Sequence, residues 1–139
     1  MKWVTWEHVG VDRMACSWLI KRWIDAEAEF SFIPIDQNSL PEDKEPFDIP
    51  GVRLSHRRGH CTFHTMLHEY QIKDPILDQM AKIIDEADTI QEAFLEPIAP
   101  GLDFICDGIR LTSPDDTTAL ERGSLIFEAI YSQLSLNRS

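Results

Sequence analysis

The order of apolar and polar positions divides the chain into a strand-rich first half and a helical second half. Aromatic and β-branched residues dominate 3–9 and 30–35, and we predict a strand in each segment. After the turn signal Pro50-Gly51 a third short strand is predicted over 52–56. The segment 37–50 holds three prolines and four acids and is predicted to be a loop.

Apolar residues recur at helical spacing through the remaining segments. Helices are predicted over 13–27, capped by Asp12, and over 63–70, capped by Thr62. The cap-plus-proline pair Asp74-Pro75 opens another helix that runs to about residue 87. Two more are predicted to start at Pro100 and Pro114. The spacing assigns these side chains to the core: Ala15, Trp18, Leu19, Trp23, Ala26, Phe63, Met66, Leu67, Tyr70, Ile76, Leu77, Met80, Ile83, Ile84, Ala87, Leu102, Ile105, Cys106, Ile109, Leu120, Phe127, Ile130, Tyr131 and Leu134.

This order of elements predicts an α/β or α+β fold. A small sheet of about three strands would occupy the N-terminal half, followed by a helical C-terminal half. No internal repeat or change of composition divides the 139 residues, so we expect a single domain over 1–139.

The net charge of -11 argues against binding to nucleic acid or to anionic membranes, because both need clustered Lys and Arg. No apolar run approaches the roughly 20 residues of a membrane-spanning helix. The three cysteines are odd in number and far apart, a pattern typical of a reducing compartment. We therefore expect a cytoplasmic protein.

Segment 53–69 differs from the rest of this acidic chain. It carries four of the five histidines, at positions 56, 60, 64 and 68, together with Cys61 and three arginines. Histidine, cysteine and arginine are the residues that bind metals, transfer protons and hold small anions. The segment is therefore the main candidate for a functional site.

One interpretation is a metal site. On a helix that begins after Thr62, the side chains of Cys61, His64 and His68 share the face opposite the apolar stripe. His56 or His60 would complete a tetrahedral set, for which Zn²⁺ or another divalent transition metal is the expected ion. The alternative is that these histidines lie on an ordinary solvated face, since the spacing matches no standard zinc signature.

A second interpretation is an anion site. The helix start at Thr62 leaves backbone N–H groups free, and Ser55, Arg57 and Arg58 precede it. Cys61 would lie at the same positive helix end, where we expect its pKa to fall. The alternative is that the two arginines are solvated loop charges paired with nearby acids.

Several segments together resemble a known family, the C-terminal domain of the chromate-resistance protein ChrB. The resemblance rests on 11–25, on Pro46-Phe47-Asp48-Ile49-Pro50-Gly51-Val52, on Ser55-His56-Arg57 with Cys61-Thr62-Phe63, and on 83–89 with Pro114-Asp115-Asp116. Members accompany a chromate efflux pump, and the domain also occurs beside sulfurtransferase domains. The resemblance places transcriptional regulation in a separate N-terminal region, so no direct DNA binding is expected. The positions that match the family pattern are Asp12, Arg13, His56, Arg57, Cys61 and Glu69, whereas His64 and His68 depart from it.

Three functional hypotheses follow. The first is an accessory or sensor domain for chromate-type oxyanions, with the anion held by Arg13, Arg57 and the helix start at Thr62. In it Cys61 is the reactive thiol and His56 a proton donor or metal ligand. The second is a metal-dependent hydrolase that uses His56, His64, His68 and either Cys61 or Glu69. The third is a non-catalytic module that binds a sulfurtransferase or a regulatory protein.

Overall fold

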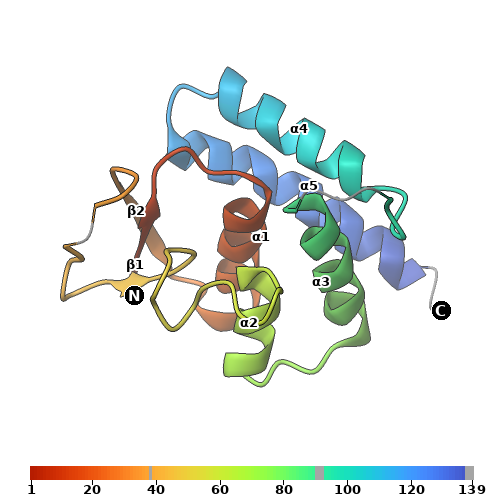
Figure 1. Ribbon diagram of the computed structural model, residues 1–139, viewed down its shortest axis with the longest axis horizontal. Helices are drawn as coiled ribbons and strands as arrows, with labels where there is room; N and C mark the ends of the chain where they lie inside the picture. Colours follow the sequence, from red (N-terminus) through yellow and green to blue (C-terminus); the bar gives the residue numbers. More distant parts are fainter. Residues whose placement is uncertain (38, 90–92, 137–139) are drawn as a thin grey trace.

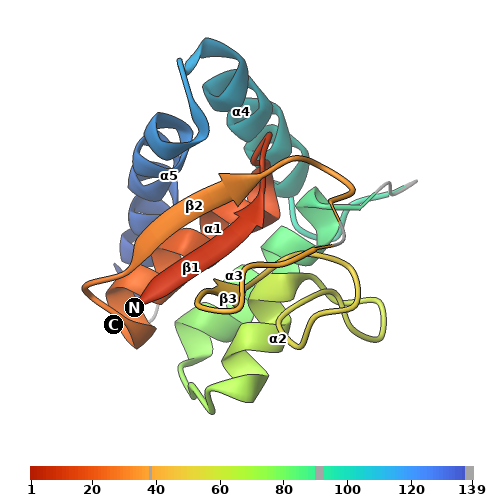
Figure 2. The ribbon, with the colours of Figure 1, turned by 90° about the vertical axis from the view of Figure 1, so that its left-hand side faces the viewer.

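A sheet of three parallel strands forms the N-terminal part of the protein, in a computed structural model that describes residues 1–37, 39–89 and 93–136. Strand β1 (Lys2–Trp6) is central and pairs with β2 (Glu29–Ile33) on one side and with β3 (Glu45–Pro46) on the other. Because the strands are parallel, their carboxyl ends meet at one edge, where open α/β sheets place ligand-binding groups. Figure 2 shows β1 and β2 in front of helix α1 (Val11–Leu19).

Helix α1 occupies the middle of the molecule. Figure 1 shows it between α4 (Ala99–Thr112) and α5 (Asp116–Leu136) on one side and α2 (Thr62–Glu69) and α3 (Pro75–Ala87) on the other. A wider π-helical turn, Ile20–Ile24, extends α1 before the chain enters β2. No helix in the described part of the chain combines the length and apolarity needed to cross a membrane.

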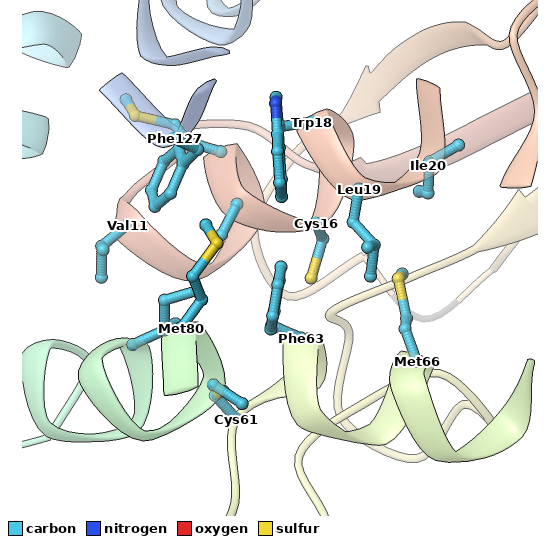
Figure 3. Packing of buried hydrophobic residues seen from close by; sticks show 14 of the residues in the cluster. Val11, Cys16, Trp18, Leu19, Ile20, Cys61, Phe63, Met66, Met80 and Phe127 are labelled. Carbon is cyan, nitrogen blue, oxygen red and sulfur yellow. The ribbon is translucent and has the colours of Figure 1, made fainter. Parts of the chain in front are cut away.

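The hydrophobic core lies around α1. Figure 3 shows Cys16 and Leu19 of α1 facing Phe63 and Met66 of α2, all of them buried. Helix α5 approaches α1 closely at Gly123, where an added Cβ would lie 2.8 Å from the sulfur of Met14. The absence of a side chain at Gly123 therefore allows these two helices to pack together.

The predicted fold class is confirmed, and most helix predictions match to within a few residues. Asp74 caps α3 as expected, accepting from the amides of Ile76 and Leu77. The six core positions predicted on α3 are all buried. The exceptions among the predicted core side chains are Trp23, Ala26 and Ile105, which are exposed.

Two predictions about strands are wrong. Residues 52–56 form no strand and make only an isolated bridge between Leu54 and Phe47. The third strand is instead β3, inside the segment predicted to be a loop. The helix predicted over 13–27 begins earlier, at Val11, and its π-helical extension ends at Ile24.

Candidate functional site

Asp12, at the start of α1, is the most buried acid among the described residues, with 2% of its surface exposed. Its carboxylate accepts the backbone N–H of Thr62 at 2.8 Å and of Phe63 at 3.0 Å. It therefore caps α2, not its own helix as the sequence predicted; α1 starts after Gly10 with no side-chain cap. A negative charge at the positive end of α2 also stabilises that helix electrostatically.

The imidazole of His56 lies among three carboxylates. Its Nε2 is 3.0 Å from Oδ2 of Asp12, 3.0 Å from Oδ2 of Asp88 and 3.6 Å from Oδ1 of Asp48. Hydrogen bonds to Asp12 and then to Asp88 raise the pKa of His56 to about 10, so the ring is cationic at neutral pH. We call Asp12, Asp48, His56 and Asp88 the carboxylate cluster.

Asp48 follows β3 at the carboxyl edge of the sheet and has a left-handed backbone, with φ of 53°. Its Oδ2 lies 3.1 Å from Nε of Arg13, and its Oδ1 accepts the hydroxyl of Thr62 at 2.6 Å. Burial, and then the charge of Asp12, raise the pKa of Asp48 to about 7. Burial likewise raises the pKa of Asp88. Both shifts arise first from burial, and the charge of Asp12 adds to them.

A cavity of about 570 Å³ borders the cluster. Its wall consists of Trp6, Arg13, Asp48, Ile49, Pro50, Gly51, Ser55, His56 and Asp88. The guanidinium of Arg13 lies over the ring of Trp6, 5.8 Å from its centre. Of the residues predicted to bind an anion, Arg13 and Ser55 are therefore located here, next to carboxylates.

The remaining predicted arginines lie at a second site, the cationic pocket. This cavity of about 180 Å³ is lined by Arg57, Arg58, His60, His64, Thr65 and His68. Paired backbone hydrogen bonds between Arg57 and His60 close a two-residue turn, in which Arg58 and Gly59 have φ of 54° and 81°. Two positive φ values are typical of a type I′ turn, which reverses the chain. The turn thereby separates the cationic pocket from the carboxylate cluster.

Cys61 is not the activated thiol that the sequence predicted. The residue is buried at the edge of the core (Figure 3), and its thiol is 3% exposed. Burial, and then the charge of Asp12, raise the pKa of the Cys61 thiol well above its usual value instead of lowering it. The expectation of a low pKa is wrong because the thiol is buried and because Asp12, in addition, offsets the positive end of α2.

The amide of Thr62 and the carboxylate of Glu69 already have partners within the protein. The Thr62 N–H donates to Asp12 and is not free for an external anion. Glu69 pairs with Arg57 at 2.9 Å and with Arg53 at 3.6 Å. The predicted metal set of His56, Cys61, His64, His68 and Glu69 does not converge on one point.

Within residues 1–37, 39–89 and 93–136, the side chains whose ligand atoms converge closely enough to share one ion are Asp12, Asp48 and His56. Sequence reasoning selected His56 and treated Asp12 as a cap, but it missed Asp48 and Asp88. Asp48 follows a two-residue strand inside an acidic loop, and Asp88 is the last of several acids on α3. Only the proximity of these elements in the fold distinguishes the two acids from other surface carboxylates.

Comparison with known proteins identifies the family. The sequence matches the family described as "ChrB, C-terminal domain" over residues 3–134. It is 29% identical over 143 residues to "Protein ChrB" of Cupriavidus metallidurans, covering 99% of this chain and 42% of that relative. The chain thus spans less than half the length of this curated relative, and no solved structure matches it. The protein belongs to the ChrB family, whose C-terminal domain it matches over residues 3–134.

Proposed function

We propose that this domain is a chromate-resistance accessory or sensor unit that holds a small oxyanion in the cationic pocket. The observation that carries the proposal is the convergence of two arginines and three histidines on one cavity in a chain of net charge -11. Membership of the ChrB family supports chromate as the relevant oxyanion. The three unpaired cysteines support a reducing compartment such as the cytoplasm.

Arg58 is the residue best placed to bind the anion. Arg57 is already neutralised in part by Glu69, whereas Arg58 has no carboxylate partner among the described residues. The type I′ turn holds Arg58 beside His60 at a left-handed φ that costs an ordinary side chain about 1 kcal/mol. A guanidinium provides several N–H donors that match the oxygens of a tetrahedral anion.

The histidines of this pocket would contribute imidazole N–H donors. His60 and His64 stack with their ring centres 3.9 Å apart, and His60 is held by Asp85 at 2.8 Å. Burial, and then the neighbouring His60, lower the pKa of His64, so that its ring is neutral at neutral pH. A bound anion would favour the protonated ring, and we therefore expect affinity to increase as the pH falls.

No thiol takes part in this proposal, because Cys61 is buried away from the pocket. The anion is bound and released unchanged, and the site carries out no redox step. The carboxylate cluster is also excluded as the anion site, since three carboxylates would repel a dianion.

The test is titration of chromate into the wild type, Arg58→Ala and Arg122→Ala by calorimetry, with sulfate as a second tetrahedral dianion. Arg122 is an exposed arginine of α5 outside the pocket and controls for the loss of one charge. Loss of a charge-assisted contact worth about 1.5–3 kcal/mol should weaken binding by at least about tenfold in Arg58→Ala alone. Equal affinity in all three proteins, or no binding by the wild type, would reject the proposal.

A second candidate, an interaction module, is favoured by apolar side chains at the surface. Phe104 and Leu111 of α4 and Leu125 of α5 are each more than 70% exposed. We propose that such a surface binds the N-terminal part of longer relatives, which the present chain does not span. Mixing this chain with the N-terminal part of the relative should give a complex that Phe104→Ser in this chain weakens; no complex at micromolar concentrations would reject this candidate.

A further inference from the structure

We infer that the carboxylate cluster is a binding site for one divalent transition-metal ion, held by His56 and the carboxylates of Asp12 and Asp48, with Asp88 close beside them. This site is separate from the cationic pocket and does not depend on the proposed binding of an oxyanion. The donors are one imidazole nitrogen and two carboxylate oxygens, with no sulfur. That set suits Mn²⁺ or Zn²⁺ better than the softer metals that thiolates select.

The spacing of the donor atoms is that of ligands around a common ion. Metal–ligand bonds of about 2.0–2.2 Å place neighbouring ligand atoms roughly 3.0–3.5 Å apart. The separations from Nε2 of His56 are 3.0 Å to Asp12, 3.0 Å to Asp88 and 3.6 Å to Asp48. A protonated Nε2 carries a single hydrogen and cannot donate a linear hydrogen bond to all three oxygens. An ion that replaces this proton would contact the oxygens of Asp12 and Asp48, and the carboxylate of Asp88 would add negative charge beside it.

The charge of the cluster also favours a divalent ion. Three carboxylates face one guanidinium, that of Arg13, whose Nε lies 3.1 Å from Asp48. With His56 bound to the ion as a neutral imidazole, the three carboxylates and the guanidinium of Arg13 leave a net charge of two minus. A divalent cation would neutralise that charge. Asp12 is held in place by the amides of Thr62 and Phe63, so the site is organised before the ion arrives.

A separate observation points to an occupant of the bordering cavity. The indole N–H of Trp6, which lines the same cavity as Asp48 and His56, is buried and has no acceptor among the described residues. An unmet buried donor costs about 1–3 kcal/mol, so such groups are normally satisfied by water or a ligand. An oxygen atom on the bound ion would supply the acceptor once the indole ring turns to open its N–H, which is closed off in the structure, towards the cavity. The cavity, of about 570 Å³, leaves room for a water molecule on the ion.

The test uses the protein without a histidine tag, dialysed against Mn²⁺ or Zn²⁺ alone, with bound metal measured by elemental analysis. We expect one ion per chain in the wild type. His56→Gln and Asp48→Asn should each lower the affinity by at least about tenfold. The control is the triple variant His60→Gln/His64→Gln/His68→Gln, which removes the other clustered imidazoles and should still bind one ion. Arg58→Ala should also bind one metal ion with normal affinity. Metal binding and oxyanion binding are thus lost in different variants, and the two proposals can fail independently.

A measurement on the wild type alone covers the case in which a cluster variant does not fold. Mn²⁺ below one equivalent should broaden the NMR signals of the His56 ring and of the Thr62 and Phe63 amides first. With Co²⁺, the absorption spectrum should lack a thiolate charge-transfer band. Broadening centred on His64 and His68, binding that survives both cluster substitutions, or no bound metal in the wild type would each overturn the inference.

Discussion

Asp12→Ala is expected to be the most destabilising single substitution in the carboxylate cluster. The side chain accepts two backbone N–H groups of α2, at 2.8 and 3.0 Å, and pairs with His56 at 3.0 Å. Losing a helix cap costs about 0.5–2 kcal/mol. Removing one partner of a buried charge pair costs about 3–5 kcal/mol, much of it because the other group is left buried without a partner. Because His56 is half-exposed and water can solvate it, we expect a total loss of about 3–4 kcal/mol.

The assay is urea unfolding followed by circular dichroism, with the free energy of unfolding extrapolated to water. The matched control is Asp116→Ala, since Asp116 also accepts two distant amides, those of His8 and Val9, but in a more exposed position. We expect that control to lose only about 1 kcal/mol. If Asp12→Ala lost less than the control, Asp12 would not be the structural link between α1 and α2 that the geometry indicates.

Three other outcomes follow from the structure. Chiefly through its hydrogen bond to Asp12, the pKa of His56 is raised from 6.5 to about 10. The positive charge of the His56 ring therefore contributes fully to stability below pH 6.5, and this contribution is lost as the pH rises through 10. Because the side chain is half-exposed, we expect this pH-dependent contribution to be about 1–2 kcal/mol. It is measured by comparing the unfolding free energies of the wild type and His56→Gln at pH 6.5 and at pH 10. A difference between the two proteins that does not change with pH would contradict the prediction. All three cysteines are buried and have a raised thiol pKa: Cys16, Cys61 and Cys106. They should therefore react with a disulfide reagent only after unfolding. Fast labelling of Cys61 in the native protein would contradict this, because it would show that the thiol is accessible. Gly123→Ala should lower the free energy of unfolding by about 1–3 kcal/mol, because the new methyl group meets Met14. Gly108→Ala has open space around it and should instead stabilise α4 by up to about 1 kcal/mol. Equal effects of the two substitutions in thermal melts would argue against close packing at Gly123.

The elements that the sequence predicted correctly are those specified by local signals. Helix α3 has a capping aspartate, a proline at its first position and six apolar residues at helical spacing, and it begins and ends where predicted. Strand β3 has no such signals, because two residues, Glu45 and Pro46, pair with β1 only through the tertiary fold. The predicted strand over 52–56 had a suitable composition, but no neighbouring strand pairs with it along its length.

The candidate site was predicted as one cluster, whereas the fold divides its residues between two cavities. Segment 53–69 is continuous in sequence, but the turn at Arg58-Gly59 places His56 and Arg58 in different cavities. Cys61 was assigned to the polar face because it is spaced correctly from His64 and His68. Its position before the first turn of α2 directs it into the core instead. The acids that surround His56 come from the start of α1, from the segment after β3 and from the end of α3, and no local pattern in the sequence connects them.

The contacts of Asp12 have a consequence for the order in which the chain folds. Its carboxylate joins α1 to amides 50 and 51 positions later, and His56 lies 44 positions from it. Contacts that close such long loops are entropically costly and form slowly compared with helices and neighbouring strand pairs. We therefore expect this junction to assemble in the final stage of folding, so that protection of the Thr62 and Phe63 amides from hydrogen exchange would report completion of the native state.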